Sequence, residues 1–177
     1  NGYYFLSGHT KEMYYTDDLH DPDSWIKATG LHGDGTGYTH YFNGIWVNTG
    51  RTYHSWTTDL SSNNWTRVAH GANDNGESII FKGRIICGGS EVGYNNNSVP
   101  GKGFIVSSDG KNWTFDTHVL TKLYNKSDVR AATRGTVDSI QEIDGRVYMV
   151  DDELIFWTTD FVNFEYKIMD RHVYNLC

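Results

Sequence analysis

The stretch Trp157-Thr158-Thr159-Asp160-Phe161, near the end of the chain, is one of four related segments. The other three read Tyr15-Thr16-Asp17-Asp18-Leu19, Trp56-Thr57-Thr58-Asp59-Leu60 and Val106-Ser107-Ser108-Asp109-Gly110. All share a Ser or Thr, one further residue and an Asp, and each is followed by an aromatic residue: Trp25, Trp65, Trp113 or Phe164. The aspartates are 41, 50 and 51 residues apart, so the sequence contains a repeat with a period of about 40–50 residues.

A second repeat lies upstream of three of these segments. Two apolar runs flank a two-residue turn that ends in Gly, within residues 41–47, 80–86 and 142–148. Two of the turns, Asn43-Gly44 and Asp144-Gly145, are typical of tight β-hairpins, because the turn that matches the strand twist needs positive φ angles. Each period therefore predicts a hairpin, a third strand, an Asp-containing turn and a fourth strand, which together form one propeller blade.

We therefore predict an all-β fold, a β-propeller with four blades of four antiparallel strands. The blades are expected at 171–177 together with 1–29, at 37–70, at 77–119 and at 136–169. The first is shared between the ends, because Leu176-Cys177 followed by Asn1-Gly2-Tyr3 continues the hairpin pattern in register. A piece of a longer propeller cut at equivalent points would show the same matching ends. The absence of an initial Met favours a domain from a larger chain.

Composition excludes several classes of protein. Aromatic residues make up 15% of the 177 residues and charged residues 21%, which argues against intrinsic disorder. The net charge of −7 disfavours a nucleic-acid partner. No apolar run approaches the ~20 residues of a membrane helix, so no membrane insertion is expected. Two cysteines, Cys87 and Cys177, cannot build a disulfide framework.

The segment Ser107-Ser108-Asp109-Gly110-Lys111-Asn112-Trp113 resembles the Asp-box, or BNR repeat, of sialidases and other propellers, although it is one residue shorter. The other three segments depart further, with Leu19, Leu60 and Phe161 after the Asp. The resemblance implies that these turns lie on the face opposite an active site. Hydroxyl and carboxylate groups in such turns bond local backbone N–H groups, so we interpret the following residues as structural: Thr16, Asp18, Trp25, Thr57, Asp59, Trp65, Ser107, Asp109, Trp113, Thr158, Asp160 and Phe164.

The opposite face is where we expect a ligand, because long loops on a rigid scaffold often carry function. A Gly/Asn-rich loop at 88–100 and a second insertion at about 120–136 lie there. The candidate ligand-binding residues are Arg51, His54, Glu91, Tyr94, Asn96, Tyr124, Arg130 and Arg134. His9, His32 and His70 are expected beside His54, but their spacing does not repeat, so no metal or other cofactor is predicted.

An enzymatic function is the alternative. A sialidase-like enzyme needs three Arg for the substrate carboxylate, a Tyr–Glu nucleophile pair and an Asp acid/base. The family's Arg-Ile-Pro segment is absent, and Arg51, Arg130 and Arg134 are the Arg residues that could reach the loop face. The Asp-containing turns also faintly resemble those of propellers that hydrolyse arabinans or xylans. Those enzymes carry three carboxylates on the innermost strands, at the propeller axis. The inner strands of this chain offer only an incomplete set of such carboxylates: Asp138, Glu142 and Glu77.

The sequence therefore favours a non-catalytic binding or structural propeller that recognises a glycan or a protein receptor. Aromatic faces and polar Asn, Asp and Gly loops suit such ligands. Asn-rich propellers of this type resemble modules of bacteriophage tail proteins and secreted bacterial surface proteins. The resemblance implies a virion-surface or extracellular location, within a larger polypeptide or virion. A glycoside hydrolase, sialidase-like or of the arabinan/xylan type, remains the alternative, with its site on the loop face.

Overall fold

The structure is a computed structural model of the 177-residue chain. It describes residues 2–7, 12–31, 36–50, 53–62, 64–69, 75–92, 101–116, 120, 123, 126–132, 137–173 and 176.

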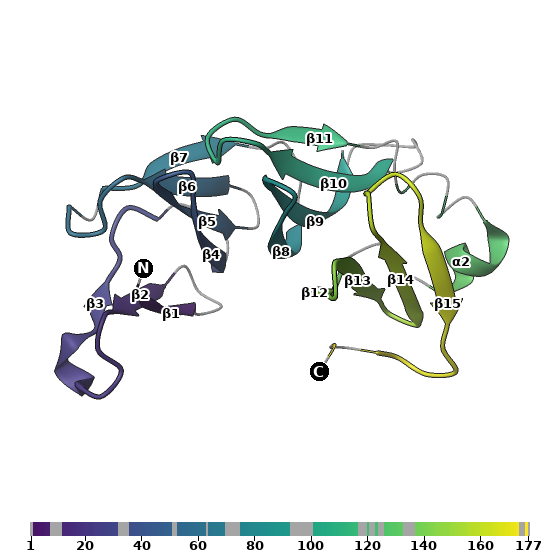
Figure 1. Cartoon of the computed structure of the whole chain (residues 1–177), viewed down its shortest axis with the longest axis horizontal. Helices are drawn as coiled ribbons and strands as arrows, with labels where there is room; N and C mark the ends of the chain where they lie inside the picture. The colour runs from purple at the N-terminus through teal and green to yellow at the C-terminus, as the bar shows by residue number, and fades with distance from the viewer. Residues whose placement is uncertain are drawn as a thin grey trace.

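Four antiparallel sheets follow one another along the chain, and each is a simple meander (Figure 1). The first has three strands, β1 (Tyr4–Ser7), β2 (Met13–Thr16) and β3 (Ile26–Lys27), with a short 3₁₀ helix, η1 (Pro22–Ser24), before β3. The second contains β4 (Thr36–Phe42), β5 (Ile45–Gly50), β6 (Tyr53–Thr57) and β7 (Thr66–Ala69).

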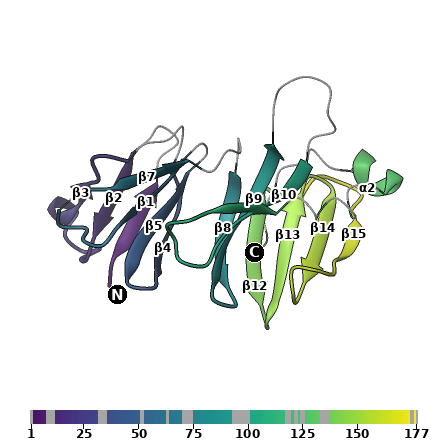
Figure 2. The same cartoon turned by 90° about the horizontal axis from the view of Figure 1, so that it is seen from above.

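The third sheet contains β8 (Asn75–Phe81), β9 (Arg84–Val92), β10 (Gly101–Ser107) and β11 (Thr114–Asp116). A helix, α2 (Ser127–Ala131), separates it from the fourth, which contains β12 (Ser139–Ile143), β13 (Arg146–Asp151), β14 (Leu154–Thr158) and β15 (Glu165–Ile168). The sheets stand side by side along an arc (Figures 1 and 2). The all-β propeller architecture with four consecutive blades is thereby confirmed.

The predicted hairpin turns are confirmed by their backbone angles. Asn43 and Gly44 have φ of 49° and 81°, and Asp144 and Gly145 have φ of 52° and 76°. Positive φ at both central residues is the signature of the type I′ turn, which matches the twist of the flanking strands. The third turn, at Lys82 and Gly83, has the same form (48° and 73°). The pattern of apolar residues around each turn therefore sets the register of the first two strands.

The hydrophobic core consists of three clusters, one at each seam between neighbouring sheets. Tyr15 of the first sheet packs with Trp46 of the second. Val47 of the second sheet packs with Ile85 of the third, while the seam between the third and fourth sheets contains thirteen buried residues, Phe104 among them. Alternate residues of each central strand face opposite neighbours, so every blade needs apolar residues on both faces. This requirement explains the nearly continuous apolar runs of β5, β9 and β13.

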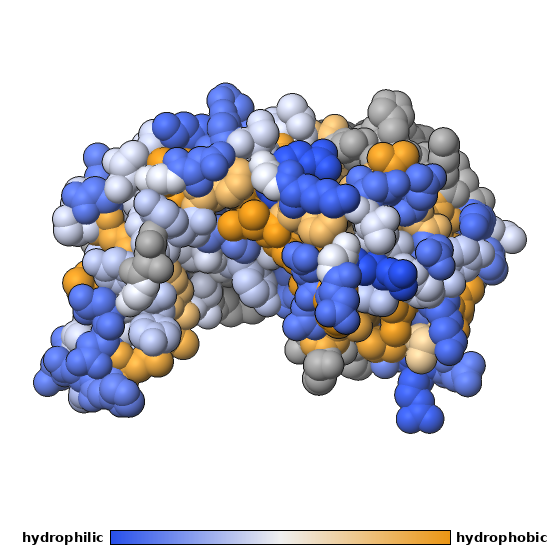
Figure 3. Space-filling view, in the orientation of Figure 1, coloured by the Kyte–Doolittle hydropathy of each residue, from blue (hydrophilic) through white to orange (hydrophobic). Residues whose placement is uncertain are grey.

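The C-terminal segment differs from the predicted shared blade. β15 ends at Ile168, and the described residues that follow it contain no strand. The backbone N–H of Val173 instead donates to the carbonyl oxygen of Asp152 (2.8 Å), and the His172 ring bonds the Asp152 carboxylate. These bonds hold the segment on the β13–β14 turn of its own sheet. The first sheet consequently has three strands, and a hollow separates the two ends of the arc (Figure 3).

The second insertion also differs from a simple surface loop. Leu120, Leu123 and Val129 are at most 4% exposed, and all three belong to the core cluster between the third and fourth sheets. Part of this insertion therefore extends the core. No helix among the described residues is long and apolar enough to cross a membrane.

Candidate functional site

In the second, third and fourth sheets, one end of the strands has the hairpin turn and the Asp-containing turn, and the other end has different connections. Each hairpin turn lies at the same end as the Asp-containing turns, since β5, β9 and β13 run away from the hairpin turn and the next strand returns. Two contacts across the seams support this: the Asn43 side-chain amide donates to Ser108 O (3.2 Å), and Lys82 Nζ donates to Thr159 O (2.7 Å). We call this the box end. The inner strands β4, β8 and β12 begin at the opposite end.

The Asp-containing turns of the box end are closed by local hydrogen bonds. In the third sheet the backbone N–H of Asp109 donates to Ser107 Oγ (3.3 Å), and those of Lys111 and Asn112 donate to Asp109 Oδ1 (2.8 and 2.7 Å). The same Ser/Thr bond to the N–H of the Asp recurs in the other three sheets, at 3.0, 3.2 and 3.2 Å, for the following pairs: Thr16–Asp18, Thr57–Asp59 and Thr158–Asp160.

These bonds determine the ionisation of the carboxyl groups. Backbone and side-chain N–H groups of Asn112 hold the pKa of Asp109 well below its usual range, and the backbone N–H groups of Asn163 and Val162 do the same for the pKa of Asp160. A carboxylate that accepts several N–H bonds is stabilised in its charged form. The aspartates are therefore engaged with their own turns, one in each sheet, and form no acid/base pair.

A polar cluster lies at the other end, where the inner strands of three sheets meet. Tyr38 on β4 donates its hydroxyl to Glu77 Oε1 on β8 (2.7 Å). The other oxygen, Glu77 Oε2, accepts from the backbone N–H of Ile140 on β12 (3.1 Å). One half-buried carboxylate thus connects three consecutive blades, while 46% of the Tyr38 side chain stays exposed.

Irregular strand pairing positions these two side chains. The register of β4 with β5 shifts between Thr36 and Thr39, and that of β8 with β9 shifts between Asn75 and Ser78. Such bulges redirect side chains and are frequent beside functional sites. Gly37 permits the first one, because a Cβ there would lie 2.2 Å from Thr49 O.

A second hydrogen-bond chain lies directly behind this pair. His40 Nε2 is 2.8 Å from Ser78 Oγ, which is 2.9 Å from Thr49 Oγ1. Burial lowers the pKa of His40 to about 4, so the imidazole is neutral at physiological pH. Ser78 is 6% exposed and Thr49 is fully buried. We call these five residues, Tyr38, His40, Thr49, Glu77 and Ser78, the axial cluster.

The axial cluster combines an exposed aromatic ring with hydrogen-bonding groups. Burial, with the hydrogen bond to Glu77 as a second cause, raises the pKa of Tyr38 to about 12, so its hydroxyl is protonated and donates to the carboxylate. The exposed Tyr38 ring offers an aromatic face, and the carboxylate oxygens accept hydrogen bonds. His40 and Ser78 resemble a base–nucleophile pair, and the Ser78 hydroxyl is buried behind Tyr38 and Glu77.

Two of the carboxylates expected on the inner strands, Asp138 and Glu142, lie at opposite ends of the fourth sheet. Asp138 precedes β12 at the axial end, where its Oδ2 accepts from the backbone N–H of Asp152 (3.3 Å). Glu142 is exposed near the hairpin turn of β12, toward the box end. Among the described residues no group of three or more His, Cys, Asp or Glu could hold a metal ion.

Of the predicted ligand-binding residues, His54 is the one whose side chain the structure describes. It is 1% exposed, accepts a bond from the backbone N–H of Gly50 at Nδ1 (3.2 Å), and packs against the Trp113 ring in a tilted arrangement with the ring centroids 4.0 Å apart. His54 therefore lies inside the seam between the second and third sheets, and its assignment to the ligand surface is wrong. The alternation of β6 places it there, facing the third sheet.

The remaining candidates lie beyond what the structure describes. Glu91 belongs to β9 and Arg130 to α2, but their side chains are outside the described residues. The others fall entirely outside them: Arg51, Tyr94, Asn96, Tyr124 and Arg134, as well as His9, His32 and His70.

Sequence reasoning noted Glu77 but missed Tyr38, His40, Thr49 and Ser78. A signal existed in the sequence: Gly37-Tyr38 and Gly76-Glu77 each place a Gly directly before the polar residue near the start of an inner strand. An isolated Gly in a strand pattern suggests a bulge. The partnership of the two side chains, 39 residues apart, depends on how neighbouring blades meet.

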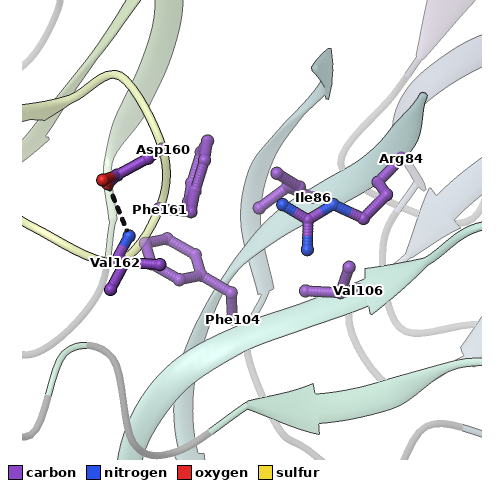
Figure 4. Close-up of a pocket in the computed structure, with 7 residues that line it drawn as sticks. All are labelled: Arg84, Ile86, Phe104, Val106, Asp160, Phe161 and Val162. Carbon is purple, nitrogen blue, oxygen red and sulfur yellow. Dashed lines mark hydrogen bonds between the residues drawn. The ribbon is translucent and has the colours of Figure 1, made fainter. Parts of the chain in front are cut away.

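A pocket of about 120 Å³ opens at the box end of the seam between the third and fourth sheets (Figure 4). Its floor is apolar, with Phe104 and Phe161, and the guanidinium of Arg84 points toward it (Figure 4). Asp160 lines one side, where it bonds the N–H of Val162 (2.8 Å). The pocket is small and faces away from the axial cluster.

No protein-family model matches the sequence, and no curated protein matches it. Solved structures do match the fold. One belongs to the GH130 family of mannoside phosphorylases, a family that contains glycoside hydrolases targeting β-1,2 mannosidic linkages in Candida mannan. The TM-score is 0.50 at 14% identity, over 76% of this chain and 48% of that one. The chain thus spans about half the length of that structure, and what the two share is the propeller fold.

Proposed function

We propose that this chain is a carbohydrate-recognising propeller module whose ligand contacts the axial cluster. The observation that carries the proposal is the Tyr38–Glu77 pair, 2.7 Å apart, at the point where the inner strands of three blades converge. Sugar rings stack on aromatic faces, and a few fixed polar groups bind their hydroxyls. A half-exposed tyrosine ring beside a carboxyl group supplies both kinds of contact.

Two further observations support this choice of site. The cluster lies at the end of the strands opposite the Asp-containing turns, which are occupied with their own backbone bonds. The structurally similar GH130 protein belongs to a family described as acting on β-1,2 mannosidic linkages, so a β-mannoside is the first ligand to try. The virion-surface or extracellular location expected from the sequence remains part of the same proposal.

Isothermal titration calorimetry with β-1,2-mannobiose, followed by a glycan array, tests the proposal. Tyr38→Ala is expected to abolish binding, because it removes both the ring and the hydroxyl. Tyr38→Phe keeps the ring and is expected to weaken binding about tenfold, the effect of one lost hydrogen bond. The matched control is Tyr41→Ala: Tyr41 is on the same strand, is 47% exposed, and faces Trp46 of the first seam.

Binding that survives Tyr38→Ala but is lost in Tyr41→Ala would refute the site. Product analysis of the same glycans addresses the hydrolase alternative. For a binding module we expect the bound glycan to be recovered intact. Release of monosaccharide by the wild type, lost in Glu77→Gln, would replace the binding function with a catalytic one.

A further inference from the structure

One position of the repeat has a large aromatic residue in three sheets and a smaller residue in the third sheet. The position directly precedes the Ser or Thr of each Asp-containing turn, and in chain order its residues are Tyr15, Trp56, Val106 and Trp157. The first three of these contribute to the seam between their own sheet and the next one. The third seam therefore has a valine where the first two seams have an aromatic ring.

In the first two seams this ring reaches the Asp-containing turn of the following sheet. The Tyr15 hydroxyl donates to the carbonyl oxygen of Leu60 (2.7 Å), in a buried hydrogen bond. The Trp56 ring lies beneath Lys111, whose Nζ is 4.4 Å from the ring centroid. Leu60 is the first residue after the Asp of its turn and Lys111 the second. In both seams a ring thus fills the space between one blade and the turn of the next.

In the third seam the pocket of Figure 4 occupies this place. Val106 lines it on one side, and Phe161 and Val162 line it on the other. Phe161 is equivalent to Leu60 in its turn, and Val162 to Lys111. The pocket is therefore the space that an aromatic ring fills in the other seams. An enclosed apolar cavity of about 150 Å³ holds benzene, so an open pocket of about 120 Å³ accommodates one six-membered ring.

A cationic side chain also lines this pocket. Arg84 is half-buried and its guanidinium points toward the pocket (Figure 4), and no hydrogen bond or ion pair joins it to another residue in the described part of the chain. The nearby Asp160 is already engaged: Oδ1 accepts from the backbone N–H groups of Val162 and Asn163 (2.8 Å each), and Oδ2 accepts from the Asn163 amide (2.9 Å). A partly buried guanidinium is best satisfied by an anion, and a carboxylate matches its geometry.

We propose that this pocket binds a small ligand in which a single aromatic ring carries a carboxylate. The ring takes the place that Val106 leaves open, against Phe161, and the carboxylate bonds Arg84. The first seam shows the same neighbourhood: Tyr3 follows its turn glycine as Arg84 does, and its ring centroid is 6.2 Å from that of Tyr15. The pocket is at the box end, so this proposal is independent of glycan binding at the axial cluster.

An NMR titration of the ¹⁵N-labelled chain tests the proposal with three ligands that share one ring and differ in charge. Phenylacetate is expected to shift the amide signals of Phe161 and Val162, with a dissociation constant on the order of 1 mM, as is usual for a ligand of this size. Neutral benzyl alcohol and cationic benzylamine are expected to bind at least tenfold more weakly, because neither supplies a carboxylate to Arg84. Acetate, which has the carboxylate without the ring, is expected to leave these signals unchanged.

Two variants test the two halves of the site. Val106→Trp supplies the indole that Trp56 and Trp157 provide in their sheets, so it is expected to abolish phenylacetate binding and to raise the urea midpoint. Arg84→Gln is expected to weaken phenylacetate binding at least tenfold and to leave benzyl alcohol binding unchanged. Arg146→Gln is the matched control, because Arg146 directly follows the hairpin turn of the fourth sheet and is exposed. It is expected to bind like the wild type.

The proposal is overturned if phenylacetate, at concentrations well above the expected dissociation constant, leaves the signals of Phe161 and Val162 in place. Binding of benzylamine as tight as that of phenylacetate would overturn it as well, because the ligand charge would then be wrong. So would a folded Val106→Trp variant that binds phenylacetate like the wild type. If that variant does not fold, Arg84→Gln decides, and unchanged phenylacetate affinity in it refutes the site.

Discussion

Phe161 occupies a backbone conformation that bulky residues avoid, and this makes a quantitative prediction. Its φ is 59°, in the left-handed region, at the position where the third sheet has Gly110 with a φ of 76°. The Phe161 side chain is nevertheless 6% exposed and packs against the rings of Phe81 (5.5 Å) and Phe104 (5.2 Å). The native state thus gains the burial of an aromatic ring and bears backbone strain at the same residue.

Two substitutions separate these contributions. Phe161→Ala removes the ring and keeps a Cβ in the left-handed region, so we expect a loss of about 4 kcal/mol in the free energy of unfolding. Phe161→Gly removes the ring and also relieves about 1 kcal/mol of strain, so we expect a loss of about 3 kcal/mol. Glycine is normally the more destabilising of the two residues, and the predicted order is therefore reversed.

Urea denaturation followed by tryptophan fluorescence measures both variants, with the midpoint compared at a constant slope. Gly110→Ala is the control for the backbone term: a Cβ there would lie 2.7 Å from Val47 Cγ2, and we expect a loss of about 1–3 kcal/mol. If Phe161→Gly unfolds at a lower urea concentration than Phe161→Ala, the strain argument is refuted. A loss below about 1 kcal/mol in both would refute the packing argument.

Three further predictions concern protons and thiols. The pKa values of Asp109 and Asp160 are lowered by folding, so their stabilisation is present above the unfolded pKa of about 4 and is lost as the pH falls. The urea midpoint should then drop less between pH 6 and pH 3 in the double Asp→Asn variant than in the wild type. His40 should titrate near pH 4 in an NMR experiment. The free energy of unfolding should therefore decrease as the pH falls from the unfolded pKa of about 6.5 to about 4, because the unfolded chain binds the proton first. Burial raises the pKa of Cys87, so in a Cys177→Ser variant a thiol reagent should react only after urea unfolds the protein; reaction in native buffer would contradict the buried position.

Much of the fold could be predicted because its determinants are local. The turns Asn43-Gly44 and Asp144-Gly145 carry residues that tolerate positive φ, and their register follows directly. The Ser/Thr and Asp side chains of each box bond backbone groups two or three residues away. Interactions over such short distances are visible in a sequence window. The four consecutive blades follow from repeating that window.

The candidate site could not be predicted to the same degree, because its contacts join distant segments. Glu77 accepts from Tyr38 and from the backbone of Ile140 only when three blades stand at the right angle to one another. His54 was misplaced because its residue type suggested a surface ligand, whereas the alternation of β6 buries it against Trp113. The ring closure predicted from matching ends was a pattern argument as well, and the bonds of Val173 and His172 to Asp152 compete with it.

The confinement of the core to seams between neighbouring blades affects how the protein opens. Each cluster joins two adjacent sheets, so stability behaves as a sum of nearest-neighbour terms, as in repeat proteins. The third sheet is supported on both sides, whereas the first has three strands and one seam. Amide protons should therefore exchange with solvent in a gradient, slowest in β9 and β10 and fastest in β1. Partial unfolding would then begin at the outer blades and leave the middle of the arc intact.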